Sequence, residues 1–259
     1  MADAAAGIHA GRVAIVTGAG QGTGGIGRAI ARRLAAEGAN VVVSDVDEGA
    51  EATARELRDA LGAEVRSHRG NLSREPAARS LARFALDAWG RIDILVNNAG
   101  GGIIKPFLEH TPQTLQETIA RNLWTAIWCT RAVLPAMLER AYGRIVNIGA
   151  DSVRTGLHHH AAYNAAKGGV HGMTTGLARE FAGHDITVNT IAPSLVNTPR
   201  FRALGASNPA LAKKFLEVIV KGRPAEPEEV AAFASFIASS EAGFITGQVL
   251  SINGGAAML

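Results

Sequence analysis

The sequence predicts an α/β fold in which a doubly wound parallel sheet of about seven strands carries helices on both faces. Short apolar, β-branched runs alternate with helical patterns along the 259 residues, as crossover connections between parallel strands require. A glycine-rich segment follows the first of these runs. Hydrophobic residues make up 47% of the chain, and no low-complexity linker or internal repeat divides it, so we expect one domain over residues 1–259.

The glycine-rich segment is the first sign of a ligand site. It covers residues 18–27, directly after the predicted strand Val13–Thr17. Apolar residues then recur at helical spacing from Ile26, and Gly38 is placed to stop this helix. Strand, glycine loop and helix in this order predict a dinucleotide site. Glycines let the backbone approach a pyrophosphate, and the helix N-terminus offers free N–H groups.

The second predicted strand, residues 41–45, ends in Asp45. An acidic side chain at this strand end is placed to accept hydrogen bonds from the adenosine ribose hydroxyls and to repel a 2′-phosphate. Asp45 therefore predicts NAD rather than NADP. Two other interpretations stay open, a polar strand end or the N-cap of a helix over residues 48–61.

The alternation continues to the end of the chain. Further strands are predicted at 64–69, 92–96, 144–148, 186–191 and 248–252, with helices at 73–89, 113–138 and 161–181. The irregular stretch 193–221 predicts an active-site lid built on short helical pieces. Ligands bind outside the carboxyl ends of parallel strands. We therefore expect the segments after the strands to converge on one site: 18–27, Asp45, Asn71, 98–100, 150–160 and 193–198.

Tyr163 and Lys167 are the candidate chemical groups. They lie four residues apart on the predicted helix 161–181, so both side chains can enter one site. A nearby cation stabilises a phenolate and lowers the pKa of a tyrosine from its usual ~10, which suits proton transfer to or from an alcohol. An ordinary helix pair is the alternative interpretation.

Composition narrows the classes of partner. The net charge of +3 is spread along the chain, and the basic segment 28–33 has the pattern of a solvated helix face, so we predict no nucleic acid. Cys129 is the only cysteine, which rules out an internal disulfide or a cysteine metal cluster. The apolar runs are too short to span a bilayer, and the first ten residues lack a secretory pattern. We expect a cytoplasmic protein without a membrane partner.

Three consecutive histidines, His158, His159 and His160, precede Tyr163 in a segment expected to wall the substrate pocket. A polar loop is the plainest interpretation, and substrate contact is the functional one. Adjacent histidines converge poorly on one ion and no acidic or cysteine partner is near, so we predict no metal.

Together these motifs resemble the classical short-chain dehydrogenase/reductase family over nearly the whole chain. The matching residues are Thr17-Gly18 with the glycine loop, Asp45, Asn97-Asn98-Ala99-Gly100, Asn122, Tyr163, Lys167, Pro193 with Val196 and Thr198, and Ile245-Thr246-Gly247 before Gly254-Gly255. The resemblance implies a Rossmann-type fold that binds a nicotinamide dinucleotide. The cofactor carries the hydride, and the protein positions it and manages the proton.

The resemblance also implies residue roles. Tyr163 would be the catalytic acid/base, Lys167 would hold the nicotinamide ribose and lower the tyrosine pKa, and Asn122 would anchor a water of the proton relay. Val196 and Thr198 would contact the nicotinamide carboxamide. The implied cofactor-binding set is Gly18, Gln21, Gly22, Ile26, Gly27, Asp45, Asn71, Leu72, Asn98, Ala99, Gly100, Tyr163, Lys167, Val196 and Thr198.

The chain departs from the family pattern at two places. The glycine loop is long, which we interpret as an insertion of Thr23-Gly24-Gly25. The catalytic serine expected thirteen residues before the tyrosine is replaced by Ala150, and the nearest hydroxyl is that of Ser152. We predict that Ser152 stands in as a catalytic residue. A reduced donor set, with Ser152 as a turn residue, is the alternative.

The expected function is an NAD-dependent oxidoreductase that interconverts a secondary alcohol and its ketone. Segment 101–135 is similar to dihydrodiol dehydrogenases of aromatic-acid degradation, which favours a cyclic alcohol such as a cis-dihydrodiol or a hydroxy-carboxylate derivative. The chain also resembles 3-oxoacyl-carrier-protein reductases, so an NADPH-dependent 3-oxoacyl-thioester reductase is one alternative. A weakly active dinucleotide-binding regulatory or scaffold protein is another. The resemblance further implies a homo-oligomer, which we expect to be a tetramer.

Overall fold

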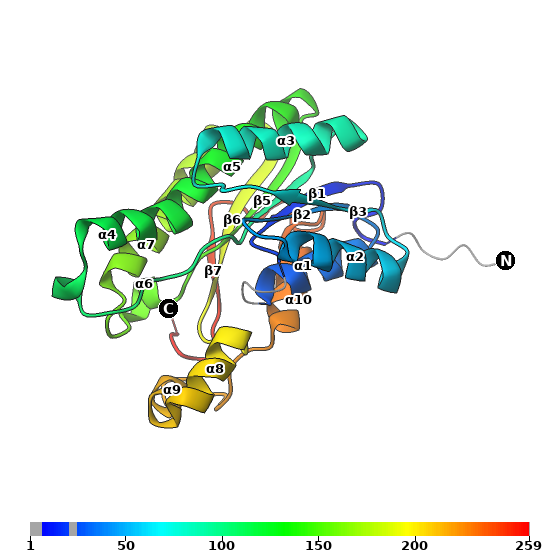
Figure 1. Ribbon diagram of the computed structural model, residues 1–259. Helices are drawn as coiled ribbons and strands as arrows, with labels where there is room; N and C mark the ends of the chain where they lie inside the picture. The colour runs from blue at the N-terminus through cyan, green and yellow to red at the C-terminus, as the bar shows by residue number, and fades with distance from the viewer. Residues whose placement is uncertain (1–6, 21–24, 259) are drawn as a thin grey trace.

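The computed structural model describes residues 7–20 and 25–258, and within them seven strands form one parallel sheet (Figure 1). The strand order is β3-β2-β1-β4-β5-β6-β7. This doubly wound sheet confirms the predicted fold, and each strand begins and ends within two residues of its expected position. The strands are β1 (Val13–Thr17), β2 (Asn40–Asp45), β3 (Val65–Arg69), β4 (Ile94–Asn97), β5 (Tyr142–Ile148), β6 (Asp185–Pro193) and β7 (Val249–Ile252).

Helices cover both faces of the sheet. One hydrophobic cluster joins the sheet to α1 (Ile26–Ala36), α2 (Gly49–Leu61) and α10 (Pro227–Ile237). A second cluster joins the opposite face to α3 (Glu75–Trp89), α5 (Thr125–Glu139) and α7 (Ala161–Glu180). The two layers lie on opposite sides of the strands in Figure 1. Because both faces are covered, the central strands β1 and β4 are buried along their whole length, whereas the edge strand β3 is polar.

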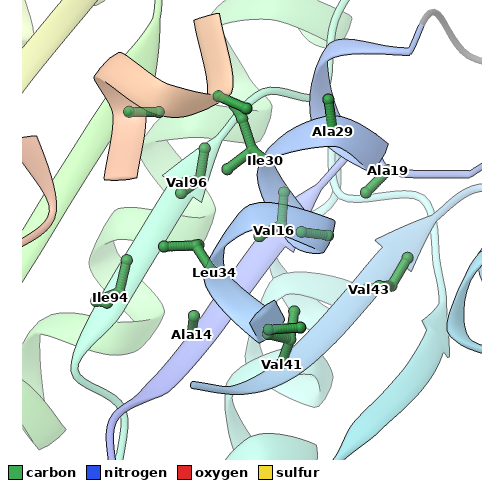
Figure 2. Close-up of a cluster of buried hydrophobic side chains, with 14 of the residues drawn as sticks. Ala14, Val16, Ala19, Ala29, Ile30, Leu34, Val41, Val43, Ile94 and Val96 are labelled. Atoms are coloured by element: carbon green, nitrogen blue, oxygen red, sulfur yellow. The ribbon is translucent and has the colours of Figure 1, made fainter. Parts of the chain in front are cut away.

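The first cluster positions the glycine-rich turn. Ile30 and Leu34 of α1 are fully buried, and Figure 2 shows them over the side chains of Ala14 and Val16 on β1. Neighbouring side chains on β1 point to the opposite cluster, as the two-residue period of a strand requires. This packing fixes the start of α1 directly above the end of β1.

The helix predicted over residues 113–138 is interrupted. The chain forms α4 (Pro112–Ile119), a π-helical segment η2 (Ala120–Trp124) and then α5. In the π segment the Asn122 amide donates to the Thr118 carbonyl at 2.8 Å. Such a side-chain bond competes with the regular backbone ladder, and π segments of this kind often accompany functional sites.

The irregular stretch that we expected as a lid contains two helices, α8 (Pro199–Ser207) and α9 (Pro209–Leu216). Each begins with a proline after a capping side chain, Thr198 for α8 and Asn208 for α9. Both helices (yellow in Figure 1) extend away from the sheet. The remaining short elements are η1 (Phe107–Glu109) and α6 (Ser152–Thr155).

Helix α10 is the element that the sequence analysis missed. It begins with Pro227 and a capping box between Glu226 and Glu229, which is a helix-start signal that can be read from sequence. Its buried apolar residues pack against α1. Among the described residues, no helix is both long enough and apolar enough to cross a membrane.

Candidate active site

A cavity of about 650 Å³ opens at the carboxyl ends of the strands. Segments that follow β1 to β4 contribute to its wall, as do Ile148 at the end of β5 and the start of α8. The predicted convergence of strand ends is therefore present except for segment 150–160, none of which lines the cavity. The predicted site residues that line this cavity are Gly18, Ile26, Asp45, Asn71, Leu72, Asn98, Ala99, Gly100, Tyr163, Lys167 and Thr198.

The floor of the cavity is held between β1 and β4. The Asn98 side-chain amide donates to the carbonyls of Thr17 at 3.0 Å and Gly18 at 2.8 Å. The Thr17 hydroxyl in turn accepts the backbone N–H groups of Asn98 and Ala99. Gly18 has a φ of +64°, and a Cβ there would lie 2.7 Å from the Ala99 Cα, so the turn requires glycine. These contacts lock the point where the strand order reverses.

The start of α1 has the features of a pyrophosphate site. Ile26, its first residue, lines the cavity, and within the described residues no side chain caps its first turn and none there is acidic. The free N–H groups and the positive dipole end favour an anion. A Cβ on Gly27 would lie 2.4 Å from the Gly18 carbonyl oxygen, so Gly27 packs the helix against the turn. The residues therefore fit a dinucleotide. Gln21 and Gly22 lie outside the described residues.

Asp45 lies at the far end of the same cavity and is only 4% exposed. Its carboxylate accepts the backbone N–H of Gly20 at 2.8 Å and that of Val46 at 2.7 Å. The N-cap of α2 is Glu48, so the interpretation of Asp45 as a helix cap is wrong. A carboxylate fixed at this strand end is positioned for the ribose of an adenosine.

Tyr163 and Lys167 enter the cavity from α7, with the Lys167 Nζ 5.9 Å from the centre of the Tyr163 ring. The Lys167 ammonium donates to the Ile148 carbonyl at 2.7 Å. Burial lowers the pKa of Lys167 to about 8. Burial also raises the pKa of Tyr163 to about 12, and the charge of Arg200 acts in the opposite direction. Both shifts follow from the cost of placing a charge away from water.

The role of Lys167 in lowering the pKa of Tyr163 stays a prediction. The only charge that lowers this pKa among the described residues is that of Arg200. Lys167 is itself desolvated, and its ammonium is bonded to the end of β5. The desolvation of the phenol outweighs the Coulomb attraction.

Asn122 pins the loop after β4 and does not line the cavity. Its side-chain oxygen accepts the Gly101 N–H at 3.0 Å, and its amide donates to the Gly101 carbonyl at 3.2 Å. A Cβ on Gly100 would lie 2.6 Å from this oxygen and 3.4 Å from the Lys167 Nζ, so Gly100 separates the two side chains. The water-anchoring role of Asn122 stays a prediction.

Thr198 and Val196 lie at the base of the lid. Thr198 lines the cavity, and its hydroxyl accepts the Phe201 N–H at 3.2 Å at the start of α8. Val196 is buried and is not among the residues that line the cavity; it forms an isolated parallel bridge with Ala225. Both roles toward a nicotinamide carboxamide stay predictions.

The three histidines do not act as a unit. His158 and His159 have ring centres 3.8 Å apart, and neither lines the cavity. The His160 ring stands edge-on to Tyr163 at 6.0 Å, and burial lowers the pKa of His160. Within the described part of the chain, no group of three or more His, Cys, Asp or Glu side chains could hold a metal ion.

Several cavity residues were not predicted from the sequence. They are Val46, Gly70, Ser73, Gly101, Glu117, Ala120, Arg121, Thr125, Ile148 and Arg200. Arg200 could have been found from its position directly after the Thr198-Pro199 helix start, at the end of a segment expected to reach the site. The others come from helix faces or strand ends without a charge or spacing signal that separates them from ordinary packing.

Comparison with known proteins identifies the family. A family model described as enoyl-(acyl carrier protein) reductase matches residues 20–257. The chain is 56% identical over 250 residues to 2,3-dihydroxy-2,3-dihydro-p-cumate dehydrogenase of Pseudomonas putida, covering 96% of this chain and 95% of that protein. The chain belongs to the short-chain dehydrogenase/reductase family. As a member it is an oxidoreductase that uses a nicotinamide dinucleotide.

Two further short-chain dehydrogenases/reductases broaden the comparison. The chain is 36% identical over 255 residues to 1,6-dihydroxycyclohexa-2,4-diene-1-carboxylate dehydrogenase of Acinetobacter baylyi, covering 94% of this chain and 95% of that protein. It also superimposes with a TM-score of 0.88 on an actinorhodin polyketide ketoreductase variant crystallised with NADPH. That pair is 34% identical, with 95% of this chain and 97% of the other covered.

Ser152 is the unusual part of this short-chain dehydrogenase/reductase site. It is buried at the start of α6, outside the cavity wall. Its hydroxyl donates to the Asn164 side-chain oxygen at 2.7 Å, and the Asn164 amide donates back to the Ser152 carbonyl at 2.8 Å. Ala150 occupies the position where the family has its catalytic serine. We propose that the Ser152 hydroxyl leaves Asn164 and donates to the substrate oxygen instead.

Replacement of Ser152 and of Asn164, one at a time, tests this role of Ser152. Ser152→Ala is expected to lower kcat about a hundredfold, because it removes a donor to the reacting oxygen. Asn164→Ala keeps the hydroxyl and should cost far less. Steady-state turnover of both variants, with cofactor binding followed by fluorescence, makes the measurement. Equal losses in the two variants would show that Ser152 acts only through the contact with Asn164.

Proposed function

We propose that the protein is an NAD-dependent dehydrogenase that oxidises a cyclic secondary alcohol of the cis-dihydrodiol type to its ketone. The observation that carries the proposal is the placement of Tyr163 and buried Lys167 on the wall of one cavity that Asp45 also lines. A dinucleotide bound along this cavity would extend from the carboxylate to the tyrosine. Its nicotinamide ring, when bound, accepts the hydride of the alcohol carbon.

The protein groups handle the proton. The Tyr163 phenolate takes the hydroxyl proton of the alcohol as the C–H hydride leaves, and the resulting phenol returns this proton to the oxygen in the reverse direction. Lys167, fixed by the Ile148 carbonyl, holds the ribose beside it. Asn122 keeps the Gly101 backbone in place under the reacting end and anchors the relay water. Thr198 and Val196 would contact the carboxamide group of the nicotinamide.

The choice of NAD rests on Asp45. Its carboxylate lines the cavity and is fixed by two backbone N–H groups, so it cannot move far from an incoming 2′-phosphate. Like charges at this distance repel, whereas two ribose hydroxyls can donate to the same carboxylate. NAD is therefore the cofactor that this end of the cavity favours.

The substrate class rests on the relatives. The names of the enzymes from Pseudomonas putida and Acinetobacter baylyi describe diols on a partly reduced ring that also carries a carboxylate. We extend this substrate class to the present chain. The NADPH-bound ketoreductase favours a second candidate, an NADPH-dependent 3-oxoacyl-thioester reductase, but Asp45 opposes that cofactor.

The assembly and location belong to the same proposal. Trp124 stacks on Trp128 at 5.0 Å yet stays 41% exposed on the outer face of the η2–α5 segment. The exposed Trp124 supports burial against another copy, and a cytoplasmic homotetramer with two-fold interfaces fits it. Each subunit would be one domain spanning residues 1–259.

An absorbance assay tests the function. Protein and NAD are mixed with 2,3-dihydroxy-2,3-dihydro-p-cumate, and separately NADPH with a 3-oxoacyl thioester, while the reduced cofactor is followed. We expect NADH formation with the diol, and Tyr163→Phe should abolish it while NAD still binds. Turnover only with NADPH and the thioester would favour the reductase. NAD binding without turnover of any substrate would favour the scaffold.

Replacement of Asp45 tests the cofactor choice. Asp45→Ala removes the ribose acceptor and the charge, so it should raise KM for NAD and lower the NAD-over-NADP preference in kcat/KM by about tenfold or more. Asp47→Ala, which removes an acid from an exposed position two residues on, is the matched control. An unchanged preference in Asp45→Ala would overturn the assignment.

A further inference from the structure

Arg200 crosses the mouth of the cavity. It lies in the first turn of α8, after the cap Thr198 and the first helical residue Pro199. Its Nη2 donates at 3.0 Å to the carbonyl of Gly102, which belongs to the loop after β4. The side chain therefore links the lid to the opposite wall, and Arg200 itself lines the cavity.

The guanidinium stands at the reacting end of the cavity. A Cβ on Gly102 would lie 2.9 Å from the Tyr163 ring, so one residue contacts the ring and accepts the hydrogen bond of Arg200. The charge of Arg200 lowers the pKa of Tyr163 and also that of His160. These three observations place a positive charge next to the position of the substrate oxygen.

No acidic side chain in residues 7–20 and 25–258 pairs with this charge. Arg200 forms no ion pair with any described residue, whereas Arg121, elsewhere on the cavity wall, is paired with Glu117. The first turn of α8 contains no acidic residue either, so the helix dipole adds to the positive field. The other fixed cation of the site, Lys167, donates to the Ile148 carbonyl. An anion that enters the substrate end is therefore attracted to Arg200.

We propose that Arg200 binds the carboxylate of the substrate and makes the enzyme selective for ring diols that carry one. This inference rests on the proposed dehydrogenase function. A guanidinium presents parallel N–H groups that match a carboxylate, and Nη1 has no bonded partner among the described residues. The bound carboxylate fixes the ring, so that the diol faces Tyr163.

A cofactor diphosphate offers the same anionic chemistry. Pro199, one residue before Arg200, lies 3.7 Å from the position of a Cβ on Gly25 at the start of α1, so α8 begins near the diphosphate site. The guanidinium itself, however, is bonded to Gly102 at the tyrosine end. This hydrogen bond, together with the effect of the Arg200 charge on His160 and Tyr163, favours the substrate carboxylate as its ligand.

A substrate pair tests the assignment. Wild type, Arg200→Gln and Arg200→Lys are compared on 2,3-dihydroxy-2,3-dihydro-p-cumate and on cis-1,2-dihydroxycyclohexa-3,5-diene, which lacks a carboxylate. We expect Arg200→Gln to raise KM for the cumate diol about tenfold to hundredfold, with a much smaller change for the uncharged diol. Effects on Tyr163 act on both substrates and cancel in the ratio of kcat/KM. Arg200→Lys should restore part of the preference.

Controls separate the outcomes. Lys214→Gln, an exposed change of equal charge on α9 away from the cavity, should leave the ratio unchanged. The Kd for NADH, measured by fluorescence, should stay the same in Arg200→Gln; a large rise with no change in the substrate ratio would assign Arg200 to the diphosphate. Turnover of both diols with an unaltered ratio overturns this inference alone. Wild type that oxidises neither diol overturns the proposed function as well.

Discussion

The partial desolvation of Tyr163 beside buried Lys167 is the constraint on which the rest of the site depends. Lys167 can be buried because the last carbonyl of β5, that of Ile148, accepts a hydrogen bond from its ammonium. The Tyr163 ring can pack against the loop after β4 because Gly102 leaves room for it, where a Cβ would approach to 2.9 Å. The parallel sheet supplies both features at its carboxyl edge, the same edge that presents the start of α1 and Asp45.

The same desolvation shifts the pKa values of both side chains. Both groups are desolvated, so the pKa of Lys167 falls to about 8 and that of Tyr163 rises to about 12. At neutral pH a phenol of that kind is a proton donor, which suits reduction, whereas oxidation of an alcohol needs the phenolate. Positive charge next to the ring lowers the pKa again. Arg200 supplies part of it, and an oxidised nicotinamide, when bound, brings more.

The sequence predicted the sheet and the edge that carries the site, because apolar strands and their order follow from local pattern. It did not predict the π segment at Asn122, since the bond from that side chain to Thr118 depends on the packed helix. It also missed Arg200, whose importance arises from a contact with Gly102 across the cavity. Long-range pairing of this kind leaves no periodic signal. The start of α10 carries a capping box, which is a local signal of a helix.

The pKa of Tyr163, with and without cofactor, tests whether desolvation and positive charge control this side chain. The chain contains two tyrosines, Tyr142 and Tyr163, so ¹³C labelling at Cζ gives two NMR signals that Tyr163→Phe assigns. Burial raises the pKa of both side chains. In the protein alone we therefore expect Tyr163 to remain a phenol above pH 10.0, the ordinary pKa of a tyrosine. Added NAD should move its titration to lower pH. If Tyr163 titrates below 10.0 without cofactor, or if its titration does not shift when NAD binds, then desolvation and positive charge do not control its pKa.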